Sequence, residues 1–180
     1  MKRFVLISVL LLASLVLSAQ DALVERVKAA NTFETLQLSF VQTRHSAMLT
    51  EDLVSEGRMV MAAPDRIRWE MLKPYRSLFV SGGSDSSGPS GSGMTKKGFR
   101  MPTEKDFTVT ALEGEDITLT LVPVRRDLKQ LFRQVVVRAD KKTLQIRSAL
   151  LVTPDGDWTL LEFKDVRTNG PVDAKLFERE

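Results

Sequence analysis

The fold is decided by residues 59–71, which read MVMAAPDRIRWEM. Two short runs flank the turn-forming pair Pro64-Asp65, and successive side chains on a β-strand point to opposite faces. The segment therefore predicts an antiparallel hairpin with two different faces. One face is apolar and holds Met59, Met61, Ile67, Trp69 and Met71, and the other is charged and holds Arg66, Arg68 and Glu70.

The apolar face of this hairpin is rich in methionine. The methionine side chain is unbranched and polarizable, so it can repack around an irregular partner. Such a face suits a surface that holds a flexible apolar ligand. An ordinary sheet core has the same pattern, so the segment alone leaves both interpretations open.

The N-terminus has the features of a secretory signal peptide. Lys2 and Arg3 form a charged start, an almost unbroken apolar run follows to Leu17, and Ser18-Ala19 precede a predicted cut at Gln20. The run is shorter than the about 20 apolar residues of a membrane span. We expect residues 20–180 to form a single domain outside the cytoplasm.

Composition excludes several classes of protein. The chain has no cysteine, so a lipobox anchor and a disulfide framework are both excluded. Lys and Arg number 26 against 23 Asp and Glu, but residues 1–19 hold two of the basic residues and no acid, which leaves 24 − 23 = +1. Nucleic-acid binding needs a stronger basic excess, so we expect no nucleic-acid partner.

The remaining patterns predict a mainly β protein with few helices. Helical spacing indicates a helix over residues 21–36, and a short helical turn is predicted over 126–131. Residues 81–93 are rich in Ser and Gly and predict a flexible loop that resembles an expression linker. Period-two segments predict strands over 38–48, 53–61, 66–71, 77–80, 107–112, 117–122, 132–139, 144–152 and 158–166. Many short strands joined by tight turns favour a strongly curved antiparallel sheet, an incomplete β-barrel.

Signals of catalysis are poor. His45 is the only histidine, and the absence of cysteine removes Cys-His dyads and zinc clusters. Turn positions explain Asp65, Asp155 and Asp157, although a hydrolase using the last two carboxylates remains an alternative. No phosphate-binding glycine loop opens a helix. We therefore expect a binding protein rather than an enzyme, with no metal and no cofactor.

A basic run follows the predicted strand over 117–122. Arg125, Arg126 and Lys129 lie in it, and they favour either a solvated face or a docking patch for an acidic partner.

Several segments in order resemble the outer-membrane lipoprotein carrier family, the LolA-like periplasmic chaperones. In the first half these are Phe33, Phe40-Val41-Gln42, Glu56-Gly57, residues 64–71, Lys73-Pro74 and residues 78–81. In the second half they are residues 107–123, residues 127–130, Asp155-Gly156, residues 169–174 and Phe177. No single motif is diagnostic, but the ordered set covers most of the chain outside 82–105.

The resemblance implies an incomplete barrel whose concave apolar face is covered by helices and shields the acyl chains of a lipoprotein. Its implied partners are acylated lipoproteins, an ATP-driven inner-membrane transporter and an outer-membrane receptor, and the protein is expected to be a periplasmic monomer. The residues expected to line the cavity are Phe40, Met59, Met61, Ile67, Trp69, Met71, Leu78 and Val80. The alternative is a sensor or regulatory module of the same fold, of the RseB type.

The sequence departs from the family in its lid. The family usually has an Arg directly before the Pro of the Pro-Asp segment, where it holds the lid shut, and Ala63 takes that position here. Arg66 and Arg68 alternate onto the outer face, so they are poorly placed to substitute. Residues 81–93 replace the lid helices, and Phe99 and Met101 are expected to be a remnant of the cover.

Overall fold

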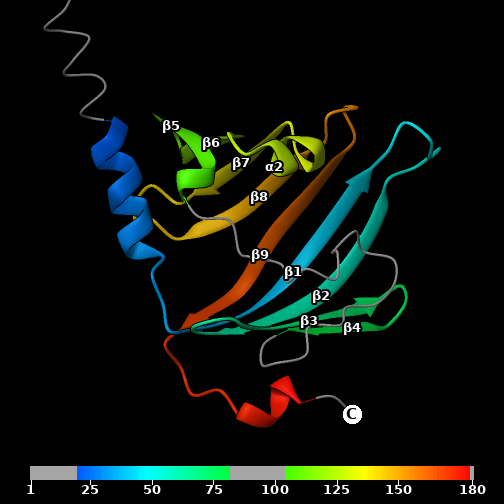
Figure 1. The fold of residues 1–180 in the computed structure, drawn as a ribbon. Coiled ribbons are helices and arrows are strands. Elements are labelled where there is room, and N and C mark those ends of the chain that lie inside the picture. Colours follow the sequence, from blue (N-terminus) through cyan, green and yellow to red (C-terminus); the bar gives the residue numbers. More distant parts are fainter. Residues whose placement is uncertain (1–19, 82–103, 179–180) are drawn as a thin grey trace, which may run out of the picture.

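Neighbouring strands of the sheet are consecutive in the sequence except at one pairing, which joins the first strand to the last. A computed structural model describes residues 20–81 and 104–178 (Figure 1). A helix over residues 20–30 comes first. The elements after it are β1 (Thr35–His45), β2 (Leu53–Ala62), β3 (Arg66–Lys73), β4 (Ser77–Ser81), η1 (Glu104–Asp106), β5 (Phe107–Glu113), β6 (Ile117–Pro123), α2 (Arg126–Leu131), β7 (Gln134–Ala139), β8 (Ile146–Val152), β9 (Trp158–Thr168) and η2 (Ala174–Phe177).

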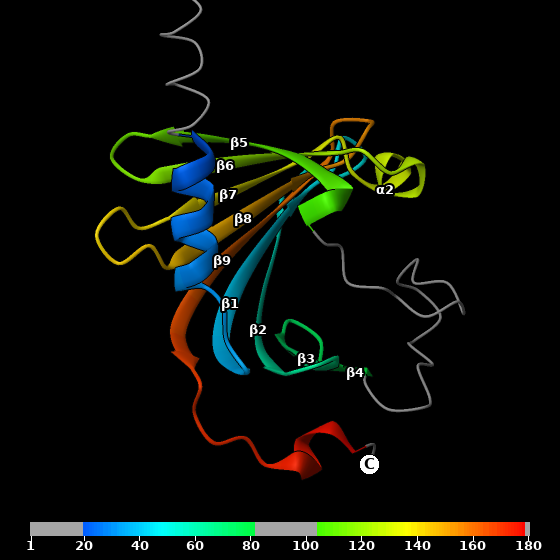
Figure 2. The ribbon, with the colours of Figure 1, turned by 60° about the vertical axis from the view of Figure 1, so that its left-hand side comes forward.

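The nine strands form one sheet in the order β4-β3-β2-β1-β9-β8-β7-β6-β5. All pairings are antiparallel, and β1 lies between β2 and β9, which joins the two halves of the chain. β4 and β5 are the edges and do not pair with each other in the described chain, so the barrel stays open. Figure 2 shows the resulting bend, with β5 above and β4 below. The prediction of an incomplete antiparallel barrel is confirmed.

The two faces of the sheet carry different cover. On the inner, concave face the helix over residues 20–30 lies across β5 to β7 (Figures 1 and 2). On the outer face the segment that leads into η2 lies beneath β3 and β4 (Figure 1). Each half of the sheet therefore has cover on a different face.

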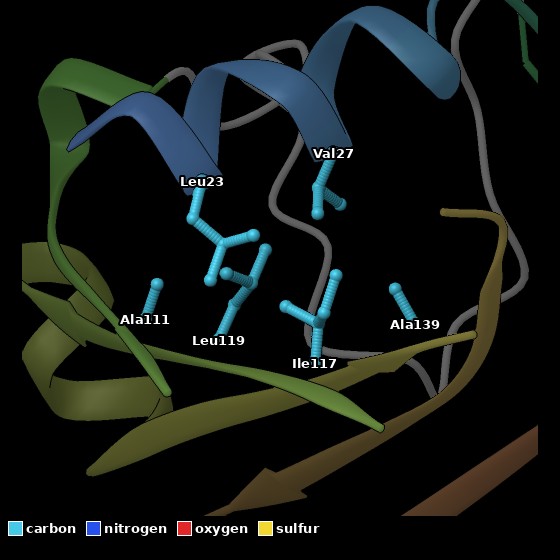
Figure 3. Close-up of a cluster of buried hydrophobic side chains, with 6 residues drawn as sticks. All are labelled: Leu23, Val27, Ala111, Ile117, Leu119 and Ala139. Atoms are coloured by element: carbon cyan, nitrogen blue, oxygen red, sulfur yellow. The ribbon is translucent and has the colours of Figure 1, made fainter. Parts of the chain in front are cut away.

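The helix forms a tight core with the second half of the sheet. Figure 3 shows Leu23 and Val27 pointing from the helix onto Ala111, Ile117, Leu119 and Ala139. Val27 and Ile117 are each 1% exposed and Ala139 is 0% exposed. Burial at this level contributes about 1.5–3 kcal/mol for each large apolar side chain. The expected N-terminal helix over the concave apolar face is thus present, and it covers one half of that face.

The predicted helix over residues 21–36 is too long. The helix ends at residue 30, and Asn31 follows it, donating its amide to Val27 O (2.7 Å) and Leu144 O (2.7 Å). Thr35 and Leu36 instead pair with β2 as the start of β1. Tertiary pairing here outweighs the local helical spacing. The short helix predicted over 126–131 is confirmed as α2.

One prediction falls almost wholly outside the described chain, and one described element was not predicted. The loop predicted over residues 81–93 lies outside it, apart from Ser81, which closes β4. The structure also contains η2, which the sequence interpretation missed. Its first turn is capped by the Asp173 carboxylate, which accepts from Lys175 N at 3.0 Å.

Candidate functional site

An apolar surface lines the concave side of β1 to β4. The strand register puts Leu38, Met59, Trp69 and Phe79 in one row across the sheet, with Leu36, Met61 and Ile67 in the next row. A third row contains Phe40, Gly57 and Met71. We call the following set the inner wall: Phe40, Met59, Met61, Ile67, Trp69, Met71 and Phe79.

The inner wall is only partly filled by the protein itself. Phe40 is 1% exposed, whereas Met59, Met61, Trp69 and Met71 pack against this cluster while remaining half-buried. A closed core would hide these side chains almost completely. The wall therefore offers apolar surface that a ligand would cover.

Phe40 anchors the wall because Gly57 gives it room. A Cβ built on Gly57 would lie 2.3 Å from Phe40 Cζ and 2.5 Å from Glu70 O, closer than real Cβ contacts. The Trp69 ring tilts over Phe40 with centroids 4.3 Å apart, and Trp69 Nε1 donates to Met71 Sδ at 3.3 Å. This role of Gly57 could not be predicted, since a glycine in a strand marks a bulge or a close contact equally well.

Two of the residues expected in the cavity lie on the other face. Leu78 pairs with Glu70, and Val80 pairs with Arg68, so both point outward with those charged residues. Val80 is buried there against Phe177. The prediction for Leu78 and Val80 is wrong because β4 presents its odd-numbered residues inward, and Phe79 takes their place beside Trp69. The other six predicted residues share the inner face, while Phe99 and Met101 lie outside the described residues.

Two hollows open on the inner face. A small one of about 120 Å³ lies at the β2–β3 turn and is lined in part by Phe33, Met61 and Ile67. A larger one of about 310 Å³ lies between the helix over residues 20–30 and β5 to β7. We call the second the helix hollow, and all but two of its lining residues are apolar: Val24, Val27, Lys28, Asn31, Phe107, Val109, Leu119, Leu121, Val137 and Ile146.

The helix hollow was not predicted. The elements that line it have apolar residues in the ordinary pattern of a protein core. The hollow exists only because the position of the helix leaves space between the helix and the sheet. Its volume is at the lower end of the range for small-molecule pockets. The inner wall and the helix hollow are both apolar, and they lie on the same face of the two halves of one sheet.

The predicted docking patch is partly neutralised. Arg125 donates from Nε to Asp127 Oδ1 at 3.0 Å and from Nη1 to Asp106 Oδ1 at 3.4 Å. The Asp127 hydrogen bond raises the pKa of Arg125 above its usual value, and Arg125 in turn lowers the pKa of Asp127 to about 2. Arg126 and Lys129 are exposed on α2. Of the three basic residues predicted to form the docking patch, Arg125 is therefore used to bind Asp127 and Asp106 at the start of α2.

The residues considered for catalysis have local structural roles. His45 Nδ1 lies 2.7 Å from Asp52 Oδ1, and its ring stacks on Trp158 at 5.2 Å. The Ser46 hydroxyl and Ala47 N hydrogen-bond to Asp157 and lower the pKa of its carboxyl. Asp155 accepts from the Thr153 hydroxyl within the same turn.

The described residues hold neither a metal-binding cluster nor a membrane-spanning helix. Residues 20–81 and 104–178 contain no group of three or more His, Asp or Glu side chains that are placed to hold a metal. Within the same ranges, no helix has the length and apolar character needed to cross a membrane.

Comparison with known proteins gives one family match. The model of the family described as outer membrane lipoprotein carrier protein LolA matches residues 31–87, which include β1 to β4 and thus the inner wall. The chain is 23% identical to an outer-membrane lipoprotein carrier protein of Coxiella burnetii (strain CbuK_Q154), over 93% of this chain and 86% of that protein. It is 24% identical to the protein of that name from Chromohalobacter salexigens, over 70% of this chain and 67% of that protein.

Solved structures show the same fold. The crystal structure of MucB in complex with MucA(peri) superposes with a TM-score of 0.52 at 14% sequence identity. The match covers 89% of this chain but only 60% of MucB, so the chain spans about three fifths of the length of that structure. At this identity the likeness concerns the fold alone.

Proposed function

We propose that the chain is a LolA-like periplasmic carrier that binds the acyl chains of lipoproteins on the concave face of its sheet. In this proposal it receives them from an ATP-driven inner-membrane transporter and delivers them to an outer-membrane receptor. Residues 1–19 would direct export, which is supported by their charged start and apolar run. The carrier acts as a monomer and needs no cofactor.

One observation carries the proposal: the inner wall is apolar and concave, yet the protein leaves all of it except Phe40 only half-buried. Met59, Met61 and Met71 supply side chains that can follow a flexible chain without a rigid fit. The family match over residues 31–87 falls on the strands that carry this wall.

Energetics favour loose shielding over complete burial. At about 0.8 kcal/mol per CH₂, a triacylated anchor with chains of ~16 carbons would gain roughly 30 kcal/mol or more on full burial. Non-covalent affinities saturate near about 18–21 kcal/mol, and a carrier must also release its cargo. A half-exposed methionine surface is consistent with partial shielding, with loading driven by an external energy source and release to a better receptor.

Native mass spectrometry of protein purified from the cell envelope tests the ligand class. We expect acylated protein or lipid to co-purify with the unaltered chain. Met59→Gln should reduce the bound fraction, because it places an amide on the inner wall. Arg58→Gln is the matched control, since Arg58 precedes Met59 on β2 and points to the outer face. Equal loading of both variants, or no acylated species at all, would contradict the proposal.

The alternative is an envelope sensor or regulatory module of the same fold. The observation compatible with it is the likeness to MucB, whose structure was solved with MucA(peri). A pull-down separates the two: capture of one membrane regulator without lipoproteins would favour the sensor. Lipoproteins that stay in the inner membrane after depletion would favour the carrier.

A further inference from the structure

A segment after β9 is fastened to the outer face directly behind the inner wall. Val172, Leu176 and Phe177 pack with Val60, Ala62 and Val80 of β2 and β4. We call Val172, Leu176 and Phe177 the outer strap. Phe177 is 9% exposed and Ala62 is 5% exposed, so the contact is a closed apolar cluster.

Two arginines of β3 hold the strap. The Arg66 guanidinium lies over the Phe177 ring, 5.0 Å from its centroid, and Arg68 Nη1 donates to Leu176 O at 3.0 Å. Arg68 also lies 3.7 Å from Glu70. These are the arginines that the sequence placed on the outer face, and the structure shows that they face the strap there.

The same stretch of β3 carries the inner wall on its other side. Arg66 and Arg68 alternate with Ile67 and Trp69, so the backbone that the strap holds from the outer side also carries the wall residues. No helix among the described residues covers the inner face of β2 to β4. The outer strap is therefore the packed layer that supports this half of the sheet.

We propose that the outer strap, clamped by Arg66 and Arg68, positions the inner wall from behind and so sets its affinity for the acyl ligand. A sheet needs an apolar layer on at least one face to be stable. By taking that layer on the outer face, the protein keeps the inner face free for ligand. Phe177, Arg66 and Arg68 are positioning residues in this scheme, because they touch the strands and never the ligand. The proposal rests on the proposed acyl-binding function.

Titration with a fluorescent long-chain fatty acid tests the proposal. The parent is Trp158→Phe, which leaves Trp69 as the single tryptophan and as a reporter of the wall. Phe177→Ala and Arg66→Gln should each weaken binding about fivefold and shift the Trp69 emission of the ligand-free protein. Arg66→Lys keeps the cation over the ring and should restore most of the affinity.

Leu128→Ala is the control for a general loss of stability. Leu128 is buried in α2, on the opposite half of the sheet, so its truncation should lower the urea midpoint and leave affinity unchanged. Affinity of Phe177→Ala within twofold of the parent, or an equal loss in Leu128→Ala, would overturn the proposal. If the parent itself fails to bind the fatty acid, the proposed function is wrong. In that case the Trp69 emission of the ligand-free protein tests the positioning role of the strap. A shift in Phe177→Ala supports that role, and no change overturns it.

Discussion

The two halves of the sheet carry their apolar cover on opposite faces. β5 to β7 bury their concave side under the helix over residues 20–30, where Val27, Ile117 and Ala139 are almost fully hidden. On the concave side of β1 to β4 the β1 residues are buried, but the wall residues of β2 and β3 stay half-buried, and a packed layer covers the convex side. Apolar residues on the inner face therefore form core under the helix and on β1, and partly accessible surface on β2 and β3.

The comparison shows that composition alone does not mark a binding surface. Both halves present apolar residues at period two, and both would satisfy the pattern of a sheet core. The difference lies in which face receives the covering segment. A single helix and a short strap, placed on opposite sides, leave one concave apolar region open.

The largest effect should come from truncating the closed half. Ile117→Ala removes a side chain that is 1% exposed, and we expect it to cost about 3 kcal/mol of unfolding free energy. Met59→Ala, on the inner wall, should cost less, about 1 kcal/mol, because that side chain is only partly buried. Urea titration followed by circular dichroism measures both. Equal losses would show that the wall is an ordinary core.

Gly57→Ala should have the next largest effect. The added Cβ meets both Phe40 Cζ and Glu70 O, so the ring must leave its place on the wall, at a cost of about 2 kcal/mol. The urea midpoint should fall and Trp69 emission should change. Adding Phe40→Leu should restore part of the loss, but not all of it, because the contact with the Glu70 carbonyl remains. A neutral Gly57→Ala would contradict the packing described for Phe40.

The smallest effect concerns α2, at the closed half. The pKa of Asp127 is held at about 2 by Arg125, below its unfolded value of about 3.9, so the carboxylate favours the folded state above about pH 4. That contribution is lost as the pH falls from about 4 through 2. Asp127→Asn should remove this part of the acid dependence and leave fatty-acid affinity unchanged. A carboxyl titration by NMR with a midpoint near 4 would show that the pair is absent in solution.

The sequence was sufficient for the strands and insufficient for their cover. The hairpin around Pro64-Asp65 could be predicted because alternation and turn residues agree over a short range. The face of β4 could not, since Ser77 to Ser81 alternates weakly and its register depends on pairing with Trp69 and Glu70.

The cover on each half depends on contacts that are distant in sequence. Val27 packs on β6, and Phe177 packs on β2 and β4. No local sequence pattern indicates on which face of the sheet these segments will pack. For the same reason, the helix hollow and the role of Gly57 became visible only with the fold, as did the pairing of Arg125 with Asp127.

The central claim is that the concave side of β1 to β4 is the ligand surface. Methionine methyl NMR tests it most directly, because Met59, Met61 and Met71 lie on the wall while Met48 lies exposed in the β1–β2 connection. On addition of a long-chain fatty acid, we predict that the three wall methyl signals shift together and that Met48 does not move. A shift confined to Met48, or no shift at the wall while the ligand is bound, would contradict the account.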